Sequence, residues 1–205
     1  MMYDISQTIR AGMPVYPGNP PVSVVRVKEA SRSSSALSRM SMGSHTGTHM
    51  DAPRHVKRSG PGIDRIALTH CYGSALVIDL TSIAFGQGIT EGDLRGKRIR
   101  KGDIVLFKTK NSLHHTFRKD FVYLTRKGAE FLVQRKVRTV GIDAAGIQKF
   151  CSGECVAHCI LLNNSVMIFE GLVLTHVPAG RYIFVGLPIK IAGGDAAPAR
   201  AILIS

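Results

Sequence analysis

The sequence predicts an α/β protein, a single domain over residues 1–205, built on a mixed and β-rich sheet. The first reason is size and composition. A chain of 205 residues with 44% hydrophobic and 20% charged side chains can bury one real core, which excludes a disordered chain. The second reason is that short apolar runs bounded by turn residues recur along the whole chain, whereas helical periodicity is confined to two segments.

Eight segments have the pattern of β-strands, because they are short and either apolar or alternating. In chain order they are residues 22–27, 36–42, 75–78, 104–107, 137–142, 166–169, 182–185 and 201–204. Strands are therefore expected to dominate the fold.

Two helices are expected between these strands. One opens at Thr90, where Asp93 completes the S/T-x-x-D/E pattern of a helix start. The other covers residues 125–136, in which Ala129 and Leu132 share a face. The strand that follows ends at Asp143, where open α/β sheets place ligands. Asp143 either supports a ligand site or caps a helix, and we favour the cap.

The chain is strongly basic, with 27 Lys and Arg against 14 Asp and Glu and a formal charge of +13. Its densest basic run, residues 95–101, contains no aromatic side chains that could stack on bases, so we interpret it as solvated surface and predict no specific nucleic-acid site. No apolar run approaches the roughly 20 residues of a membrane span, and no secretory leader is recognisable at the start. We expect a cytoplasmic protein.

Three of the four cysteines cluster at Cys151, Cys155 and Cys159. A disulfide framework is not expected in a chain of this size, and the spacing differs from that of common zinc knuckles, even with His158 nearby. We therefore expect reduced thiols that serve in packing.

The most informative segment contains His45, His49, Asp51 and His55 within eleven residues. Imidazole nitrogen and carboxylate oxygen form the donor set that suits zinc, manganese or iron(II). The simpler alternative is that the histidines hydrogen-bond backbone groups of a turn while Asp51 forms an Asx-turn. A cluster this dense favours the metal site.

Glycine and proline in this segment argue against a helix, so we expect a tight loop in which Gly47 reverses the chain and His45, His49 and Asp51 converge. Three protein ligands leave coordination positions open, as in catalytic rather than structural sites. A metal bound there makes hydrolysis of an amide or ester feasible at neutral pH, and His55 is then free to transfer protons.

Residues 45–55, His-Thr-Gly-Thr-His-Met-Asp-Ala-Pro-Arg-His, resemble the H-x-G-T-H-x-D-x-P-x-H signature of the cyclase family, which includes bacterial kynurenine formamidases and isatin hydrolases. The resemblance covers nearly the whole chain. It implies a swivelling β/β/α fold, a divalent metal centre and hydrolysis of carbon–nitrogen bonds in amides or lactams. It continues at residues 14–18, 77–80, 102–106, 140–143, 170–174 and 177–180.

The resemblance also implies roles for individual residues. His45, His49 and Asp51 would bind a first ion, and Asp51 would bridge to a second ion. The second ion would be held by His158 and Glu170, and His55 would be the acid/base. One or two ions of zinc or manganese are therefore expected per chain.

Two departures from the kynurenine formamidases bear on the substrate. Those enzymes commonly carry a Trp near Tyr16, and this chain has no Trp, so Tyr16 is expected to contact the substrate instead. Residues 144–148 read Ala-Ala-Gly-Ile-Gln in place of a T-P-S-x-D pattern, which argues against formylkynurenine.

The leading hypothesis is thus a metal-dependent hydrolase of a small amide, formamide or cyclic amide, expected to form a homodimer or homotetramer. The alternative is a non-catalytic metal-containing protein whose basic surface binds nucleic acid or an acidic partner. A free histidine beside the ligands favours the enzyme, because a structural site does not need one.

Overall fold

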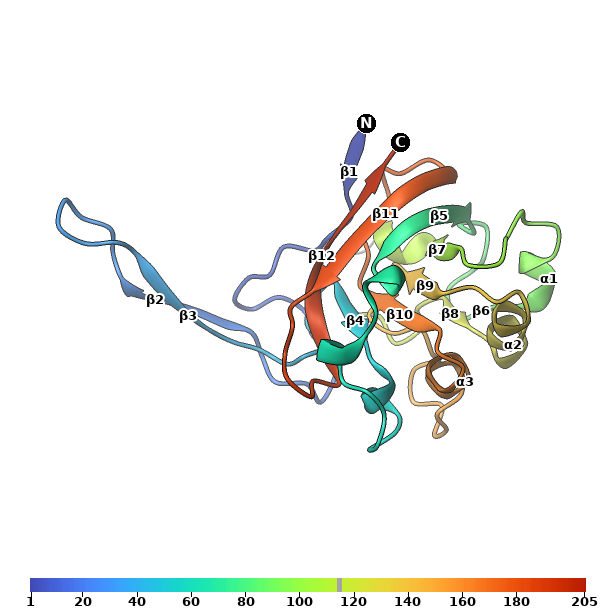
Figure 1. Ribbon diagram of the computed structural model, residues 1–205, viewed down its shortest axis with the longest axis horizontal. Coiled ribbons are helices and arrows are strands. Elements are labelled where there is room, and N and C mark those ends of the chain that lie inside the picture. The colour runs from blue at the N-terminus through green and yellow to red at the C-terminus, as the bar shows by residue number, and fades with distance from the viewer. Residues whose placement is uncertain (114–115) are drawn as a thin grey trace.

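The fold is a closed, mixed β-barrel with helices on one side and a long hairpin projecting from the other (Figure 1). The computed structural model describes residues 1–113 and 116–205. The main sheet has the strand order β1-β12-β11-β5-β7-β9-β10-β4, and β4 also pairs with β12, which closes the ring. Its strands are β1 (Met2–Asp4), β4 (His49–Asp51), β5 (Tyr72–Asp79), β7 (Ile104–Lys108), β9 (Thr139–Ile142), β10 (Met167–Glu170), β11 (Gly180–Pro188) and β12 (Ala196–Ile204).

Closure depends on the length of β12. Its nine residues pair with β11 on one edge, while the other edge accepts β4 at residues 196–198 and β1 at residues 202–204. The strands β5, β7, β9 and β10 run parallel, and the remaining pairs are antiparallel. The mixed sheet predicted from the sequence is confirmed.

The parallel strands need crossover connections, and helices provide them. Helix α2 (Arg126–Gln134) precedes β9, and α3 (Ala157–Asn163) leads from β9 to β10. The predicted starts at Thr90 and Thr125 are confirmed, because each side chain caps its helix, α1 (Glu91–Leu94) and α2 respectively. Short pieces complete the fold: β6 (Gly88–Ile89) pairs with β8 (Tyr123–Leu124), and 3₁₀ turns cover Pro53–His55, Ile63–Arg65, Leu68–His70 and Lys110–Leu113.

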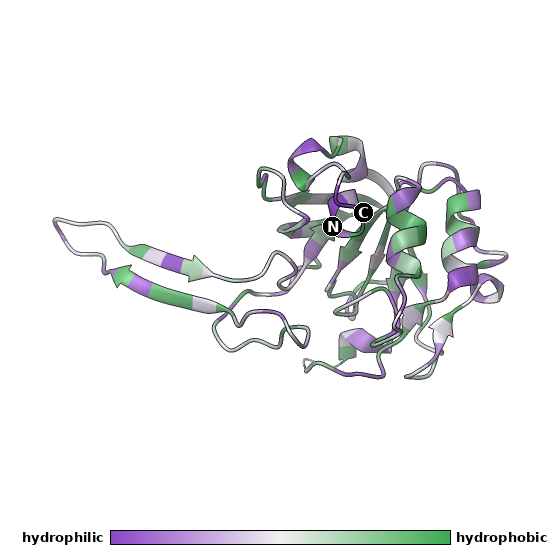
Figure 2. Ribbon diagram, turned by 90° about the horizontal axis from the view of Figure 1, so that it is seen from below, coloured by the Kyte–Doolittle hydropathy of each residue, from purple (hydrophilic) through white to green (hydrophobic). Residues whose placement is uncertain are grey.

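The predicted strands at 22–27 and 36–42 are confirmed as β2 (Ser23–Lys28) and β3 (Leu37–Ser41), but they form a sheet of their own. Every residue of both strands is exposed, and the hairpin extends away from the barrel with apolar residues along it (Figure 2). The alternating pattern of these residues predicted the two strands correctly. It could not show that the hairpin they form lies outside the main sheet.

The expectation of reduced cysteines is wrong for one pair. Cys155 and Cys159 form a disulfide, with their Cα atoms 5.5 Å apart, whereas Cys71 and Cys151 are free. The physical reason is local, since the turn into α3 brings residues four apart within disulfide range. A search of the described residues for a helix able to cross a membrane finds none.

Candidate metal centre

The predicted loop at residues 45–55 contains a short strand that sequence reasoning missed. Side chains alternate along β4, so His49 and Asp51 lie on one face, while Met50 is fully buried in the core on the other. In the antiparallel pair with β10, Glu170 lies directly opposite His49. Three potential ligands therefore come from two neighbouring strands.

Two glycines shape the entrance to β4. Gly47 adopts a left-handed backbone with φ +62°, as predicted for a chain reversal. Gly171, at φ +66°, packs so closely on the Gly47 carbonyl that a Cβ atom there would collide with it. The Thr48 hydroxyl donates to the Gly171 carbonyl at 2.6 Å, and His49 Nδ1–H donates to the Gly47 carbonyl at 2.9 Å. The second nitrogen of His49, Nε2, is therefore left for the site.

Two further histidines approach these carboxylates from other elements. His45 precedes β4, and its Nδ1 lies 2.9 Å from Asp51 Oδ1. His158 comes from α3, and its Nε2 lies 2.9 Å from Glu170 Oε1 and 3.7 Å from Asp51 Oδ2. The five residues expected to bind metal thus gather around the Asp51 carboxylate, although they span 126 positions of sequence between His45 and Glu170.

His49 Nε2 and both Asp51 oxygens are buried and make no well-oriented hydrogen bond, although His45 Nδ1 forms an ion pair with Asp51 Oδ1. His49 Nε2 lies 3.5 Å from Asp51 Oδ1 and 3.4 Å from Glu170 Oε2, so the lone pairs converge without satisfying one another. Buried polar groups are normally paired, and a divalent cation is the partner that would satisfy nitrogen and oxygen acceptors together.

Ligand atoms fall into two groups, each within 4.8 Å: His45, Asp51 and His55, and His49, Asp51 and Glu170. The family resemblance implies instead that His49 binds the first ion together with His45 and Asp51. The two divisions differ because His49 lies as close to Glu170 as to Asp51. The donors fit one ion or two, with Asp51 common to both groups.

The charges in the site stabilise one another. Burial acts to raise the pKa of Glu170, but the hydrogen bond from His158 and the positive charges of His158 and His49 outweigh it and lower that pKa well below its usual range. Burial acts to lower the pKa of His45, but Asp51 and Asp195 outweigh it and raise the pKa of His45 from 6.5 to about 9. Metal-free His45 is therefore protonated at neutral pH.

His55 differs from the other histidines. It reaches solvent, and its ring centroid lies 4.3 Å from that of His45 and 5.3 Å from that of His158. Partial desolvation, together with the charges of these two histidines, lowers the pKa of His55 despite the opposing carboxylates. His55 is thus held neutral at pH 7, the form that accepts a proton.

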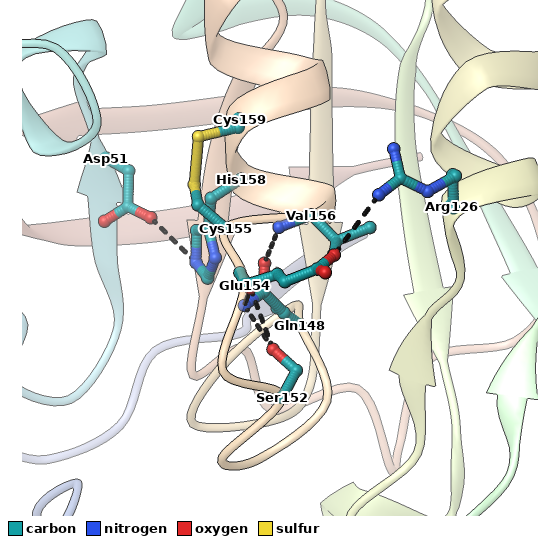
Figure 3. Close-up of a disulfide and its surroundings, with 9 residues drawn as sticks. All are labelled: Asp51, Arg126, Gln148, Ser152, Glu154, Cys155, Val156, His158 and Cys159. Atoms are coloured by element: carbon teal, nitrogen blue, oxygen red, sulfur yellow. Dashed lines mark hydrogen bonds and ion pairs between the residues drawn. A yellow bond between two sulfur atoms is a disulfide. The ribbon is translucent and has the colours of Figure 1, made fainter.

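A disulfide and several hydrogen bonds hold the segment before α3 in place near His158 (Figure 3). The Cys155–Cys159 disulfide spans the turn that carries His158. Gln148 accepts from the Val156 backbone N–H at 2.6 Å and donates to the Glu154 carbonyl at 2.6 Å. Gln148, which departs from the formamidase pattern, therefore has a structural task here.

Several of the predicted site residues line a pocket of about 610 Å³, a volume within the range of small-molecule sites. His45, His55, His158 and Glu170 line it, as does Tyr16. A second cavity of about 330 Å³ shares Ala145 with it but is lined by none of the predicted metal ligands.

Two aromatic residues that sequence reasoning missed support Tyr16. The Phe117 and Phe150 ring centroids lie 5.4 Å and 5.5 Å from that of Tyr16. Their positions in the sequence, more than 100 residues beyond Tyr16, gave no signal of this cluster.

Asp143 is an anchor, and no helix of the described residues starts at it, so the predicted N-cap role is wrong. Its buried carboxylate accepts hydrogen bonds from the backbone and hydroxyl groups of Thr109 and Ser112, at 2.7–3.2 Å. This network ties the chain after β7 to the end of β9.

A closed mixed barrel with a centre of His, Asp and Glu donors defines a class of metal-dependent hydrolases, and comparison with known proteins identifies the family. The Cyclase family model, described as "Putative cyclase", matches residues 3–149. A kynurenine formamidase from Erythrobacter litoralis is 36% identical over 98% of this chain and 93% of its own length. The chain belongs to the cyclase family.

Solved structures agree with this assignment. A protein described as a potential metal-dependent hydrolase with cyclase activity is 39% identical, with a TM-score of 0.88 over 99% of this chain and 96% of its own. Isatin hydrolase A from Ralstonia solanacearum is 25% identical, with a TM-score of 0.86 over 100% of this chain and 92% of its own. The fold predicted from the resemblance is confirmed.

Proposed function

We propose that this protein is a metal-dependent hydrolase that cleaves the carbon–nitrogen bond of a small amide, formamide or cyclic amide. The observation that carries the proposal is the convergence of unpartnered, buried His49 and Asp51 atoms beside a pocket that His55 also lines. Similarity to kynurenine formamidases and an isatin hydrolase supports amides as the substrate class.

In this proposal His45, His49 and Asp51 would hold a first divalent ion, and His158 and Glu170, together with Asp51, would hold a second. Zinc and manganese suit this mixture of imidazole nitrogen and carboxylate oxygen. A metal bound there would supply Lewis-acid polarisation of the amide carbonyl and a water of lowered pKa.

The remaining steps belong to the chain's own residues. His55 lies at the pocket surface and is neutral at pH 7, so it can take a proton from the attacking water and return it to the departing nitrogen. Tyr16, braced by Phe117 and Phe150, offers an aromatic face to the acyl or amine part of the substrate.

Aromatic amides are therefore the first substrates to test. The panel contains an aryl formamide, a cyclic aryl amide, formylkynurenine and a simple aliphatic amide. Formylkynurenine is included because relatives carry the kynurenine formamidase name, although the differences at residues 144–148 argue against it. Hydrolysis of an aromatic amide that stops on chelation and returns with zinc or manganese supports the proposal, and a panel without turnover in any metal state contradicts it.

A binding protein without catalysis is the second candidate, and the enzyme relatives do not favour it. The lack of specific nucleic-acid binding remains a prediction. The cytoplasmic location also remains a prediction. The Cys155–Cys159 disulfide does not support it, because disulfides are more typical of an oxidising compartment.

Metal binding should strengthen with pH in a defined window. In the metal-free chain, protonated His45 stabilises the fold because its pKa is raised on folding. This contribution is complete below about pH 6.5 and is lost as the pH rises to about 9. A metal must displace the same proton, so the increase in melting temperature on adding zinc should grow from pH 6.5 to 9. Thermal unfolding of metal-free and loaded protein measures this increase. The variant His176→Ala should retain the trend, and an increase that is equal at all pH values would contradict it.

We also propose that the protein is a homodimer or homotetramer in which a second copy covers the β2–β3 hairpin. An isolated two-stranded hairpin is marginal in water, and apolar side chains such as Val24 and Met40, 39% and 62% exposed, lie opposite each other on it.

Lysines at these two positions should therefore break the assembly. The double variant Val24→Lys/Met40→Lys is expected to elute as a monomer while keeping a folded barrel, because the hairpin lies outside the main sheet. Light scattering at micromolar concentration measures the mass, and Arg32→Ala at the hairpin tip is the control. A monomeric wild-type protein would contradict the assembly.

A further inference from the structure

His45 has partners at both ends of its ring. Its Nδ1 faces Asp51 Oδ1 at 2.9 Å, on the side where His49 Nε2 also points. Its Nε2 faces the opposite way and lies 3.0 Å from Asp195 Oδ2. No sequence pattern indicated Asp195, which is 150 residues from His45 and outside the histidine segment.

The backbone places Asp195 at this position. It lies just before β12, where Ala196 pairs with Asp51 and the Asp195 carbonyl accepts from the Ala52 N–H at 2.9 Å. The preceding turn is fixed because Gly193 N–H donates to Asp64 Oδ1 at 2.9 Å. The carboxylate that faces His45 is thus set by the same strand pairing that closes the barrel.

A carboxylate offers only acceptor atoms, so the contact at 3.0 Å places a proton on His45 Nε2. When His45 gives up its Nδ1 proton, as metal binding requires, Asp195 retains the remaining proton on Nε2 and leaves the Nδ1 lone pair directed at the Asp51 side of the site. His49 is fixed in the same manner by a different group, since its Nδ1–H donates to the Gly47 carbonyl and its Nε2 remains for the site.

We infer that Asp195 is a positioning residue that orients His45 and fixes its tautomer for metal binding. The inference rests on the proposed metal centre and adds a residue that acts through His45 without touching the substrate. The Asp195 side chain is 45% exposed, so it makes this contact from the protein surface and is not part of the buried donor set.

The test is zinc affinity, measured on the full chain by competition with a chromophoric chelator. Asp195→Ala is expected to weaken zinc binding by about 10- to 100-fold, the usual effect of losing a carboxylate behind a ligating histidine. Asp195→Asn keeps an acceptor oxygen and should lose less than Asp195→Ala. Ser44→Ala is the matched control, because it removes another partner of the same carboxylate oxygen, at 3.3 Å, and leaves His45 untouched.

Nitrogen NMR of the histidine side chains in the zinc-loaded protein provides a readout that a purely structural role would not change. Wild-type His45 should show a protonated Nε2 hydrogen-bonded to a carboxylate, and this signature should be lost in Asp195→Ala. At saturating zinc, KM should stay near the wild-type value.

The outcomes separate this inference from the proposed function. If Asp195→Ala binds zinc as tightly as wild type, or if His45 is protonated on Nδ1 in the loaded protein, the inference is wrong even if amides are hydrolysed. If zinc affinity falls as expected but the wild-type protein cleaves none of the amide panel, the inference stands and the proposed activity fails.

Discussion

Replacing His49 with alanine is expected to remove bound metal and turnover together. His49 is 2% exposed, and its Nε2 has no hydrogen-bond partner while lying within 3.5 Å of both carboxylates. Losing a residue that merely supports a ligand costs about 10- to 100-fold in affinity, so losing a ligand itself should cost more than about 100-fold.

Elemental analysis and amide hydrolysis on the same preparations measure both effects. The control is His70→Ala, since His70 hydrogen-bonds the Arg138 carbonyl at 3.0 Å, away from the site, and should affect stability alone. Full metal content and full activity in His49→Ala would show that the ligand assignment is wrong.

His55→Ala should behave differently. We expect metal content and folding close to wild type but turnover lower by about 10²- to 10⁴-fold, the usual contribution of a positioned acid/base. The lowered pKa of His55 favours the neutral, proton-accepting form, so the acidic limb of the wild-type pH–rate profile should reflect this group and should be lost in the variant.

Two other roles for His55 predict other outcomes. A ring nitrogen of His55 lies within 4.8 Å of the ligand atoms of His45 and Asp51, so a ligand role would lower metal content as in His49→Ala. A role in orienting Asp51 would cost about 10- to 100-fold in metal affinity or activity. Wild-type turnover with an unchanged pH profile would remove His55 from the mechanism.

Local patterns predicted most of the fold. The strands β7, β9 and β10 and residues 75–78 of β5 are largely buried in the structure, and their solid apolar runs identified them because both faces of these segments are covered. Thr90 and Thr125 marked helix starts because capping uses side chains within three residues. Helix α3 was missed because it spans seven residues and begins in the cysteine cluster.

The site was predictable where its residues are close in the sequence. His45, His49, Asp51 and His55 fall in one segment, whereas His158 and Glu170 were identified only through the family resemblance. Asp195 reaches His45 because β12 pairs with β4, a contact between distant parts of the chain that no local pattern encodes. Likewise, β4 was missed because its buried residues are mostly polar, which hides the strand pattern.

The most direct test of the metal centre is an anomalous difference map from crystals of the zinc- or manganese-loaded protein. We predict one peak contacted by His45 Nδ1, His49 Nε2 and Asp51, and a second, about 3.5–4 Å away, contacted by His158, Glu170 and Asp51. A single peak at the first position would leave a one-ion enzyme. A fully loaded protein with no peak among these five residues, or with their side chains turned away from the ion, would contradict the metal centre and the hydrolase that depends on it.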